Sequence, residues 1–269
     1  MMRLAQHNSG MHVVVCVKQI PDPAEPGSLD PATKTLKRTG NIILDESDSY
    51  GVEMALQLVT NAGGGTVSLV SMAPGGETKG LRTALAMGAS DAILVSDPAL
   101  SGTDALGTAK VLAAAIARKS PDLVLTATES SDGYTGTVPS QIAELMGLPS
   151  VTFAKSIEID GSSVNVRRQT ESGYEEVTCP LPAVVSVTAG VVEPRYPSFK
   201  GIMAAKSKPV EVLTVADLGL SASDVGWAGG GQEIVEIAAA EAREAGRVVE
   251  DEGEGFAEIV TFLENLKVI

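Results

Sequence analysis

The sequence predicts an α/β protein with an open, mostly parallel sheet and helices on both faces. Short apolar runs alternate with amphipathic stretches from Met11 to about Pro149. Near-continuous apolar strands of this kind are typical of parallel sheets that are buried on both faces. Apolar residues make up 44% of the chain but aromatic residues only 3%. Ala, Val, Leu and Ile must therefore fill the core, as they do where helices pack on a sheet.

The pattern locates the strands and helices of this region in order. The expected strands are 13–17, 66–71, 92–95 and 122–127. The expected helices are 48–62, 76–88, 103–118 and 138–146. In the second helix Leu81, Ala84 and Leu85 follow the i, i+3, i+4 spacing of one buried helix face. This alternation predicts a Rossmann-like domain, an open α/β fold in which ligands bind outside the carboxyl ends of the strands.

Two further regions depart from the alternation. Residues 21–43 are rich in proline and glycine, which predicts a loop and a small hairpin inserted after the first strand. From 151 to 187 the apolar runs are short and follow one another directly, with turn residues at Asp160–Gly161 and Ser172–Gly173. Such spacing favours a small antiparallel β region.

The same pattern suggests where the domain begins and ends. Residues 1–10 contain no apolar run of the signal-peptide type and are expected to be disordered, an upstream start or a cloning remnant. One domain is expected over 11–221. The stretch 222–252 is rich in Gly, Ala and Glu, which is typical of a mobile linker. A terminal arm follows, in which one helix face carries Phe256, Ile259, Val260, Leu263 and Leu266.

Composition argues against several classes of function. The formal net charge of −14 disfavours nucleic-acid binding. No apolar run approaches the ~18–20 residues of a membrane-spanning helix, so we expect a cytoplasmic protein, or a mitochondrial-matrix protein in a eukaryote. His7 and His12 are the two histidines and both are N-terminal, which leaves little room for histidine acid–base catalysis. Cys16 and Cys179 are too far apart in sequence for a disulfide framework or a zinc site.

A ligand site is expected where parallel strands end. Three segments end at the carboxyl edge, at 16–18, 71–75 and 126–133. In the third, small and hydroxyl-bearing residues precede a helix, where backbone N–H groups favour a phosphate. The alternative is ordinary helix capping by Ser131, Asp132 or Thr137. The sequence has neither a G-x-x-x-x-G-K-[ST] loop nor a G-x-G-x-x-G after the first strand, which favours binding without hydrolysis.

Single residues near this edge allow alternative interpretations. Glu129 and Asp132 could form a catalytic carboxylate pair, but capping or ribose binding is favoured. Lys18 could meet a phosphate or be a solvated loop lysine. Cys16 is expected to be a small buried hydrophobic residue rather than a nucleophile. Elsewhere, Arg167 and Arg168 could form salt bridges or face a partner.

The segment 193–208 differs from the rest of this acidic chain. It reads EPRYPSFKGIMAAKSK and contains four basic residues, Arg195, Lys200, Lys206 and Lys208, against one acid. Two prolines favour extended or turn backbone in its first half, and Tyr196 and Phe199 add aromatic side chains. A basic segment with exposed aromatic residues predicts a contact surface, first of all for an acidic partner.

These motifs together resemble the beta subunit of electron transfer flavoprotein over about residues 11–269. The matching stretches are V-C-V-K-Q-I-P-D at the first strand, V-E-M-A-L-Q-L at 52–58, R-T-A-L-A-M-G-A at 82–89, E-S-S-D-G at 129–133 followed by I-A-E-L-M-G-L-P, a signature similar to Val166–Ser186, and E-P-R-Y followed by G-I-M-A-A-K. The last match is the most specific, because no general rule of the fold requires it. Ser172 and the Thr137–Val138–Pro139 sequence depart from the usual family pattern.

The resemblance implies an electron-transfer subunit without catalytic residues or a metal. Such subunits form a heterodimer with an alpha subunit that holds the redox-active FAD. The heterodimer accepts electrons from dehydrogenases, among them the acyl-CoA dehydrogenases of fatty acid oxidation. It passes them through a quinone-linked oxidoreductase to the respiratory quinone pool. The beta subunit holds AMP in ordinary members, or a second FAD in electron-bifurcating members, and AMP is expected here.

The resemblance also implies residue roles. The nucleotide site maps onto Cys16, Asp45, Glu46, Ser47, Asp48, Met72, Ala127, Thr128, Glu129, Ser130, Ser131, Asp132, Gly133, Tyr134, Thr135, Gly136, Thr137 and Val138. The segment that docks partner dehydrogenases includes Arg195, Tyr196, Phe199, Lys200, Ile202 and Met203, with Phe199 in the place of the apolar anchor. The arm within 222–269 would contact the alpha subunit. The rival interpretation is a stand-alone α/β protein that binds or hydrolyses an adenine nucleotide, and a third is a structural subunit with an empty site.

Overall fold

The computed structural model describes residues 10–25, 27–238, 246, 248–251 and 253–269. The chain divides into two compact units, the first ending at Glu233 and the second running from Ile234 to Ile269. Each unit is described by itself. Residues 1–9, for which we expect disorder or a non-native remnant, lie outside the described residues.

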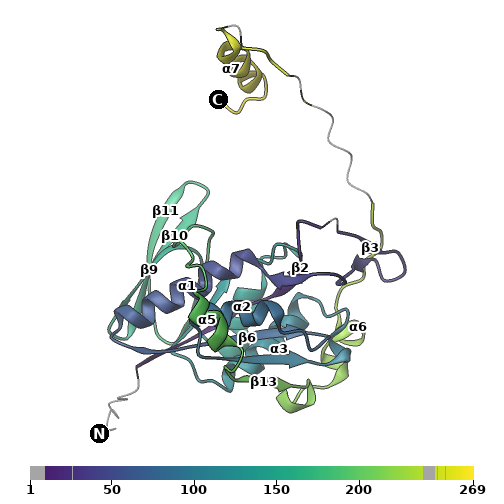
Figure 1. Cartoon of the computed structure of the whole chain (residues 1–269), viewed down its shortest axis with the longest axis vertical. Helices are drawn as coiled ribbons and strands as arrows, with labels where there is room; N and C mark the ends of the chain where they lie inside the picture. The colour runs from purple at the N-terminus through teal and green to yellow at the C-terminus, as the bar shows by residue number, and fades with distance from the viewer. Residues whose placement is uncertain (1–9, 26, 239–245, 247, 252) are drawn as a thin grey trace. The chain divides into compact units, whose positions relative to one another are not determined.

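A nine-stranded sheet forms the centre of the first unit, in the order β11-β10-β9-β12-β8-β1-β6-β7-β13 (Figure 1). Its strands are β1 Met11–Cys16, β6 Gly65–Ala73, β7 Asp91–Ser96, β8 Leu123–Ala127, β9 Ser150–Asp160, β10 Ser163–Thr170, β11 Gly173–Pro180, β12 Ala183–Val187 and β13 Val210–Leu213. The strands from β9 to β13 pair in parallel along this order. Only β10 and β11, at one edge, are antiparallel. The predicted α/β class with a mostly parallel sheet is confirmed.

Helices cover both faces of this sheet. They are α1 Glu46–Asn61, α2 Lys79–Met87, α3 Ala105–Ala117 and α4 Val138–Met146. Alternate residues of β1 contribute to two separate cores: Val13 and Val15 pack in the core that contains α1 and α2. Val14 and Cys16 pack in the core that contains α3 and α4. The all-apolar β1 sequence is therefore explained by burial on both faces.

The insertion after β1 is a pair of nested ribbons. β2 (Gln19–Pro21) pairs with β5 (Ile42–Leu44), and between them β3 (Leu29–Asp30) pairs with β4 (Thr35–Leu36). The prediction of a loop followed by a hairpin therefore captures only part of this region. The outer pairing brings the end of the insertion back beside β1, immediately before α1.

The antiparallel β region is also present, but both of its turns lie one residue from their predicted positions. The two-residue connections are 161–162 and 171–172. Asp160 still belongs to β9, so the first turn begins at Gly161, whose φ of 58° suits glycine. In the second turn Gly173 already opens β11.

The end of the first unit lies beyond the expected boundary at residue 221. Two short 3₁₀ turns, η2 Ala216–Leu218 and η3 Ala222–Asp224, lead into α6, Gly226–Gly229. The Gly226 N–H donates to Thr103 Oγ1 at 2.8 Å, and Val225 is buried. These contacts hold 222–233 on the domain, so the segment expected as a linker is shorter at its start. Its residues 239–245, 247 and 252 lie outside the described residues.

The second unit contains the helix α7, Gly255–Asn265. Its apolar side chains Phe256, Ile259 and Phe262 are exposed within the described part of the chain. None of the helices formed by the described residues has the length and apolar character needed to cross a membrane.

Candidate functional site

The predicted ligand site lies where β1, β6 and β8 end. Cys16, at the end of β1, belongs to the core on the α3/α4 side of the sheet, and Met72 and Val138 pack against that core. Ala127 ends β8 and is buried. These four residues, which the resemblance assigns to the nucleotide site, therefore form the apolar part of this edge.

Cys16 contributes a neutral surface to the site. Burial, together with the neighbouring Asp48 carboxylate, raises the pKa of its thiol to about 12. A thiol of this kind is not a nucleophile at neutral pH, because the reactive form is the thiolate. The interpretation of Cys16 as a small buried hydrophobic residue agrees with this environment.

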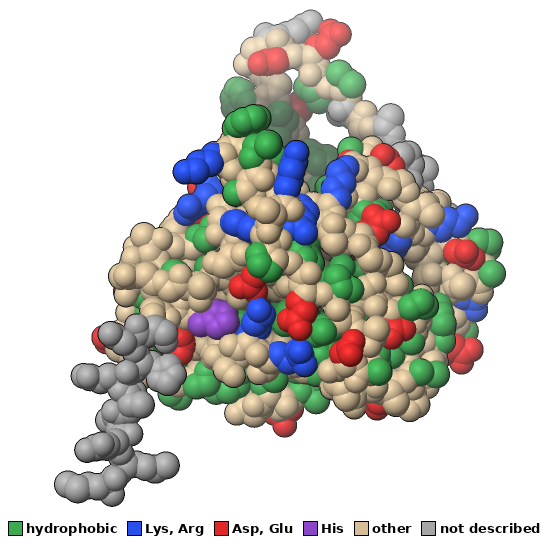
Figure 2. All heavy atoms as spheres, turned by 60° about the horizontal axis from the view of Figure 1, so that its bottom comes forward, with side chains coloured by type: hydrophobic (Ala, Val, Ile, Leu, Met, Phe, Trp, Pro, Cys, Tyr) green, Lys and Arg blue, Asp and Glu red, His purple; other side chains and the backbone are tan. Residues whose placement is uncertain are grey.

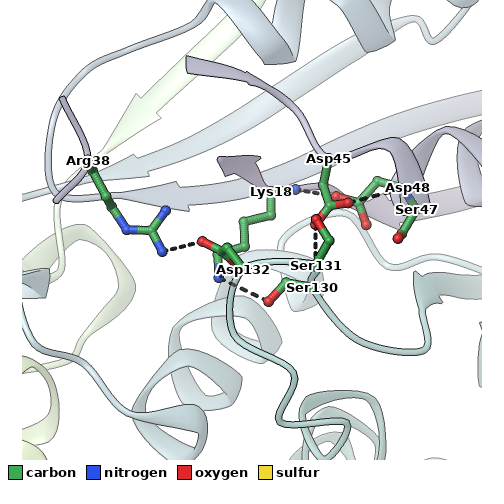
Figure 3. Close-up of polar contacts among 8 residues, drawn as sticks. All are labelled: Lys18, Arg38, Asp45, Ser47, Asp48, Ser130, Ser131 and Asp132. Carbon is green, nitrogen blue, oxygen red and sulfur yellow. Dashed lines mark hydrogen bonds and ion pairs between the residues drawn. The ribbon is translucent and has the colours of Figure 1, made fainter. Parts of the chain in front are cut away.

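Asp45 joins the beginning of α1 to the loop that follows β8 (Figure 3). It is fully buried and occupies the N-cap position of α1. Its Oδ1 accepts from the Ser47 N–H at 3.0 Å, and its Oδ2 accepts from the Ser131 N–H at 2.8 Å. One carboxylate therefore fixes two backbone segments that are far apart in the sequence.

Asp48, in the first turn of α1, ties the helix to the residues that follow β1. Its Oδ2 accepts from the Lys18 N–H at 2.6 Å. Burial raises the pKa of the Asp48 carboxyl well above its usual range, and the nearby Asp45 and Asp132 carboxylates add to the rise. The hydrogen bond from Lys18 opposes the rise but does not outweigh it.

Asp132 lies between two cations. Its Oδ1 is 2.6 Å from Lys18 Nζ, and its Oδ2 pairs with the Arg38 guanidinium from the nested insertion (Figure 3). Lys18 Nζ also donates to Ser130 Oγ at 3.1 Å. Burial alone would raise the pKa of Asp132, but the two cations outweigh it and the pKa is lowered. Lys18 is therefore held against the loop and is not a freely solvated lysine.

The loop after β8 exposes its other residues. Thr128 Oγ1 donates to the Val187 carbonyl of β12 at 3.0 Å and anchors the start of the loop. Tyr134 and Gly136 have positive φ angles of 48° and 64°, so the backbone turns sharply before α4. Five other residues of the predicted site are exposed in this loop: Glu129, Gly133, Tyr134, Thr135 and Thr137. No described contact joins Glu129 to Asp132, whose two carboxylate oxygens pair with Lys18 and Arg38.

Helix α4 begins without a capping side chain. Thr137 occupies the N-cap position, but its side chain makes no capping hydrogen bond within the described part of the chain. Of the other predicted caps, Ser131 donates its backbone N–H to Asp45, and the Asp132 carboxylate pairs with the two cations. Thr137 therefore does not cap α4, and the Asp132 carboxylate is engaged elsewhere. The first N–H groups of α4 have no side-chain acceptor from these residues.

An adenine nucleotide fits the residues at this edge. Thr126, directly before Ala127, is buried, and its Oγ1 has no hydrogen-bond partner among the described residues. By the alternation of β8 it lies on the α3/α4 side, where Cys16 and Met72 lie. A buried hydroxyl without a partner is costly unless a ligand or water satisfies it. An apolar surface, a hydroxyl and an uncapped helix start match a base, a sugar and a phosphate.

The predicted docking residues lie together in 193–208, which is called the docking segment below; its docking role stays a prediction. The first half of 193–208 forms neither helix nor strand, and the second half forms α5, Phe199–Ala205. Tyr196 and Phe199 are 94% and 81% exposed, and Ile202 and Met203 are about half exposed. Lys200 is also exposed. Figure 2 shows one face of the molecule on which Lys and Arg side chains gather near exposed hydrophobic side chains.

Arg195 already has a partner within the chain. Its Nε and Nη2 donate to the two carboxylate oxygens of Glu53 at 2.6 and 2.9 Å. Glu53 lies in α1 and is buried. Burial would raise the pKa of Glu53, but the hydrogen bonds from Arg195 and Gln57 lower it overall. Arg195 therefore attaches the docking segment to α1.

Arg167 and Arg168 form cross-strand salt bridges on the β10–β11 ribbon. Arg167 pairs with Glu176 at 3.7 Å and lies 4.3 Å over the Tyr174 ring. Arg168 pairs with Glu175 at 3.6 Å. Among the described residues, no group of three or more His, Cys, Asp or Glu side chains could hold a metal ion.

Sequence reasoning missed three residues that the structure places in or beside these sites: Arg38, Glu53 and Arg82. Thr126 lies in the predicted segment 126–133 but was not singled out within it. Glu53 and Arg82 lie within the family-like stretches 52–58 and 82–89, which was the available signal. Arg38 lies in the insertion, where nothing in the sequence distinguishes it from neighbouring basic residues.

The fold defines an α/β protein with a mostly parallel sheet, and comparison with known proteins narrows the class. Residues 33–218 match the sequence model of the electron transfer flavoprotein domain. The chain is 38% identical over 264 residues to electron transfer flavoprotein subunit beta of Mycobacterium tuberculosis, covering 96% of this chain and 99% of that protein. It is 37% identical over 240 residues to the protein of the same name from Thermoanaerobacterium thermosaccharolyticum, covering 88% and 92%.

A third relative carries a different name. Subunit CarD of the caffeyl-CoA reductase-Etf complex of Acetobacterium woodii is 39% identical over 213 residues, covering 78% of this chain and 81% of that protein. Because the family match and the identities extend over most of the chain, the protein belongs to the beta-subunit family of electron transfer flavoproteins. Members of this family are electron-transfer proteins that work in a complex with flavin, and the subunit name implies an alpha partner.

Proposed function

We propose that this chain is a non-catalytic subunit that binds AMP and docks the proteins from which its heterodimer receives electrons. The alpha subunit would hold the redox-active FAD. Acyl-CoA and other flavin dehydrogenases would donate electrons, which pass on to a quinone-linked oxidoreductase and the quinone pool. A cytoplasmic location stays a prediction. The observation that carries the proposal is that the carboxylates of the nucleotide site, Asp45, Asp48 and Asp132, are all engaged in bonds that join chain segments.

A bound nucleotide would complete this set of bonds. Asp45, Lys18 and Asp132 already connect β1, α1, the insertion and the loop after β8. A ligand that satisfies Thr126 and the start of α4 would add to the same connection. Binding to the folded state alone stabilises it by mass action. The role of AMP is therefore structural, and no residue of this chain needs to act on it.

The nucleotide can be identified directly. The heterodimer, produced with its alpha subunit, is denatured in acid and its nucleotides are separated by chromatography. We expect one AMP and one FAD per heterodimer. Two FAD and no AMP would mean that the chain belongs with electron-bifurcating members, and one FAD alone would mean an empty beta site. Hydrolysis of ATP by the purified protein would favour the rival, a stand-alone nucleotide hydrolase.

Thr126 allows a test of the site itself. Thr126→Val replaces the unpartnered hydroxyl with a methyl group of similar size, and we expect AMP affinity to fall about tenfold. Thr178→Val, on β11, is the matched control because its hydroxyl bonds to Asn165 at 2.6 Å on the exposed ribbon. Equal AMP content in the two variants would remove Thr126 from the site.

Phe199 is the proposed anchor for the partner dehydrogenase. An exposed aromatic side chain on a helix that is attached from behind is suited to enter an apolar pocket. Phe199→Ala should slow electron transfer from the dehydrogenase at low heterodimer concentration about tenfold or more, while assembly with the alpha subunit survives. Val212→Ala is the control, because Val212 is also exposed but lies on the edge strand β13. Unchanged transfer in Phe199→Ala would reject the anchor.

A further inference from the structure

Helix α5 is too short to hold the proposed docking side chains in place by itself. It contains seven residues, and isolated helices of this length are not stable in water. Ser198 caps its start by accepting from the Gly201 N–H at 3.0 Å. Within the helix only Ala205 is buried, whereas Phe199, Ile202 and Met203 face outward. The conformation of α5 must therefore depend on contacts from outside the helix.

Arg82 of the neighbouring helix α2 supplies the first of these contacts. Its Nη1 donates to the Ala205 carbonyl at 2.7 Å and to the Lys208 carbonyl at 2.6 Å. Ala205 is the last residue of α5, where carbonyl groups lack partners within the helix. A cation at this end also interacts favourably with the helix dipole. Arg82 thus caps α5 and the turn that follows it.

Lys208 makes the corresponding contact with the carboxyl end of α2. Its Nζ donates to the Leu85 carbonyl at 2.9 Å and to the Ala89 carbonyl at 2.6 Å, at the end of α2. Burial lowers the pKa of Lys208 relative to its usual value, which agrees with an ammonium group held inside this contact. Each of the two helices therefore receives at its carboxyl end a cation that the other segment provides.

Gly201 brings the two helices into backbone contact. A Cβ atom at this position would lie 2.4 Å from the Ala86 carbonyl oxygen, which is closer than atoms can approach. Any side chain here would push α5 away from α2. Glycine is therefore required at position 201 for α5 to lie this close to α2.

Helix α2 is itself firmly attached. Gln19 Oε1 accepts from the N–H groups of Gly80 and Leu81 at 2.9 and 3.3 Å, and its Nε2 donates to the Glu77 carbonyl at 2.6 Å. Leu81 and Leu85 are fully buried in the core. Helix α2 is thus held at its start by Gln19 and along its length by the core. It can therefore hold α5 in one orientation.

We propose that Arg82 and Lys208 are positioning residues for partner docking, because they hold α5 so that Phe199, Ile202 and Met203 are presented in one arrangement before the partner arrives. This inference rests on the proposed docking function of the segment. A surface that is ordered in advance binds more tightly, because less conformational entropy is lost on association. This role requires no contact between either residue and the partner.

The test uses the complete heterodimer and measures the dependence of electron transfer from a reduced acyl-CoA dehydrogenase on heterodimer concentration. In Arg82→Gln we expect the half-saturating concentration to rise about tenfold while the maximal rate is unchanged. Arg82→Lys, which keeps the charge, should recover part of the loss. Arg118→Gln is the control, since Arg118 pairs with Glu211 on the exposed surface and should change neither value.

Two further measurements separate positioning from general instability. Amide hydrogen exchange in 199–208 should quicken in Arg82→Gln, while exchange in the core strands stays the same. Gly201→Ala, which displaces α5 without removing a charge, should raise the half-saturating concentration in the same way. A normal half-saturating concentration in both variants, or a fall in the maximal rate alone, would overturn the proposal.

Phe199→Ala, measured in parallel, distinguishes the two proposals. If Phe199→Ala weakens docking but Arg82→Gln and Gly201→Ala do not, the docking function stands and the positioning role is wrong. If Phe199→Ala has no effect, the docking function itself fails. Where both proposals hold, the double variant Arg82→Gln/Phe199→Ala should lose less than the sum of the single losses, because positioning matters only for a side chain that is present.

Discussion

The nucleotide site and the docking segment use charged side chains in opposite ways. At the site, charges from β1, α1, the insertion and the loop after β8 turn inward and bond to one another, as with Lys18 and Asp132. In the docking segment, Arg195 and Lys208 bond backwards to the domain, and aromatic and apolar side chains are left outside. Under the proposed function, the first arrangement would close a site around a small ligand, and the second would present a surface to a large partner.

This difference teaches that a basic residue in the docking segment is not by itself a partner contact. The sequence singles out four cations in 193–208, but Arg195 and Lys208 are occupied by Glu53 and by carbonyl groups of the domain. Lys200 and Lys206 are exposed, and their side chains form no ion pair or hydrogen bond among the described residues. Electrostatic attraction of an acidic partner would then depend on them, and tight binding on Phe199 and its apolar neighbours.

The largest expected effect comes from Asp45, whose one carboxylate holds both α1 and the loop after β8. Asp45→Ala removes the N-cap and leaves the Ser131 N–H without its acceptor. We expect a loss of about 2–4 kcal/mol in the free energy of unfolding, measured by denaturant titration. Bound nucleotide should be lost as well.

Ser198→Ala is the matched cap variant in the docking segment, since Ser198 caps the exposed helix α5. It should cost only about 0.5–1 kcal/mol and leave the nucleotide bound. Asp45 is a buried cap that joins two segments, whereas Ser198 is an exposed cap within one segment. Equal losses in the free energy of unfolding for the two variants would contradict this contrast.

The next effect concerns Glu53, which connects α1 to the docking segment. Glu53→Gln leaves the Arg195 guanidinium without its counter-ion, and we expect a loss of about 1–2 kcal/mol because the carboxylate is buried while Arg195 is half exposed. Docking should weaken, and nucleotide content should be unaffected. A loss of nucleotide without a change in docking would show that Glu53 belongs to the site and not to the segment.

The fold was largely predictable because its signals are local. Alternation of apolar runs and amphipathic stretches placed the parallel strands and the helices, and for α4 the predicted range is the observed one, Val138–Met146. The exceptions, the two turns of the antiparallel region, are also local. Gly161 and Gly173 each suit either a turn or the residue beside it, so the sequence pattern placed each turn only to within one residue. The packing of 222–233 depends on Thr103 and other distant residues, which composition does not reveal.

The bonds that build the two regions were not predictable in the same way. Arg38 meets Asp132 across 94 residues, Arg195 meets Glu53 across 142, and Arg82 meets Ala205 across 123. A charged residue on a helix or loop has the same sequence appearance whether it faces solvent or a distant carboxylate. Family-like stretches marked Glu53 and Arg82 as notable, but only the fold supplies their partners.

A smaller effect should appear as a dependence on pH at Asp48. Its pKa is raised in the folded protein, so the native state binds more protons than the unfolded state above about pH 4. The free energy of unfolding therefore falls as pH rises through the folded pKa. Asp48→Asn keeps an oxygen acceptor for the Lys18 N–H and should remove this fall. We expect the free energy of unfolding of Asp48→Asn to rise relative to that of the parent protein as pH rises. This difference should be smaller than the loss expected for Glu53→Gln.

Asp132→Asn provides the control of opposite sign. The pKa of Asp132 is lowered in the folded protein, so its contribution is present above the unfolded pKa and is lost as pH falls through the folded pKa. This variant should be less stable than the parent at neutral pH, and the difference should vanish in acid. Denaturant titrations at several pH values measure both. Parallel pH profiles for the two variants would contradict the assigned environments.

The smallest effect is expected at Arg167, which belongs to neither region. Arg167 and Glu176 are both exposed on the β10–β11 ribbon, and such pairs contribute little because water and salt screen them. Arg167→Ala should cost about 0.5 kcal/mol or less, including its contact with the Tyr174 ring. Assembly with the alpha subunit and docking should be unchanged. If assembly with the alpha subunit weakens instead, the β10–β11 ribbon is a partner surface. A basic residue that forms an intramolecular salt bridge would then also be able to contact the partner. The contrast between inward-bonded charges and outward-facing apolar side chains would then apply to the docking segment alone.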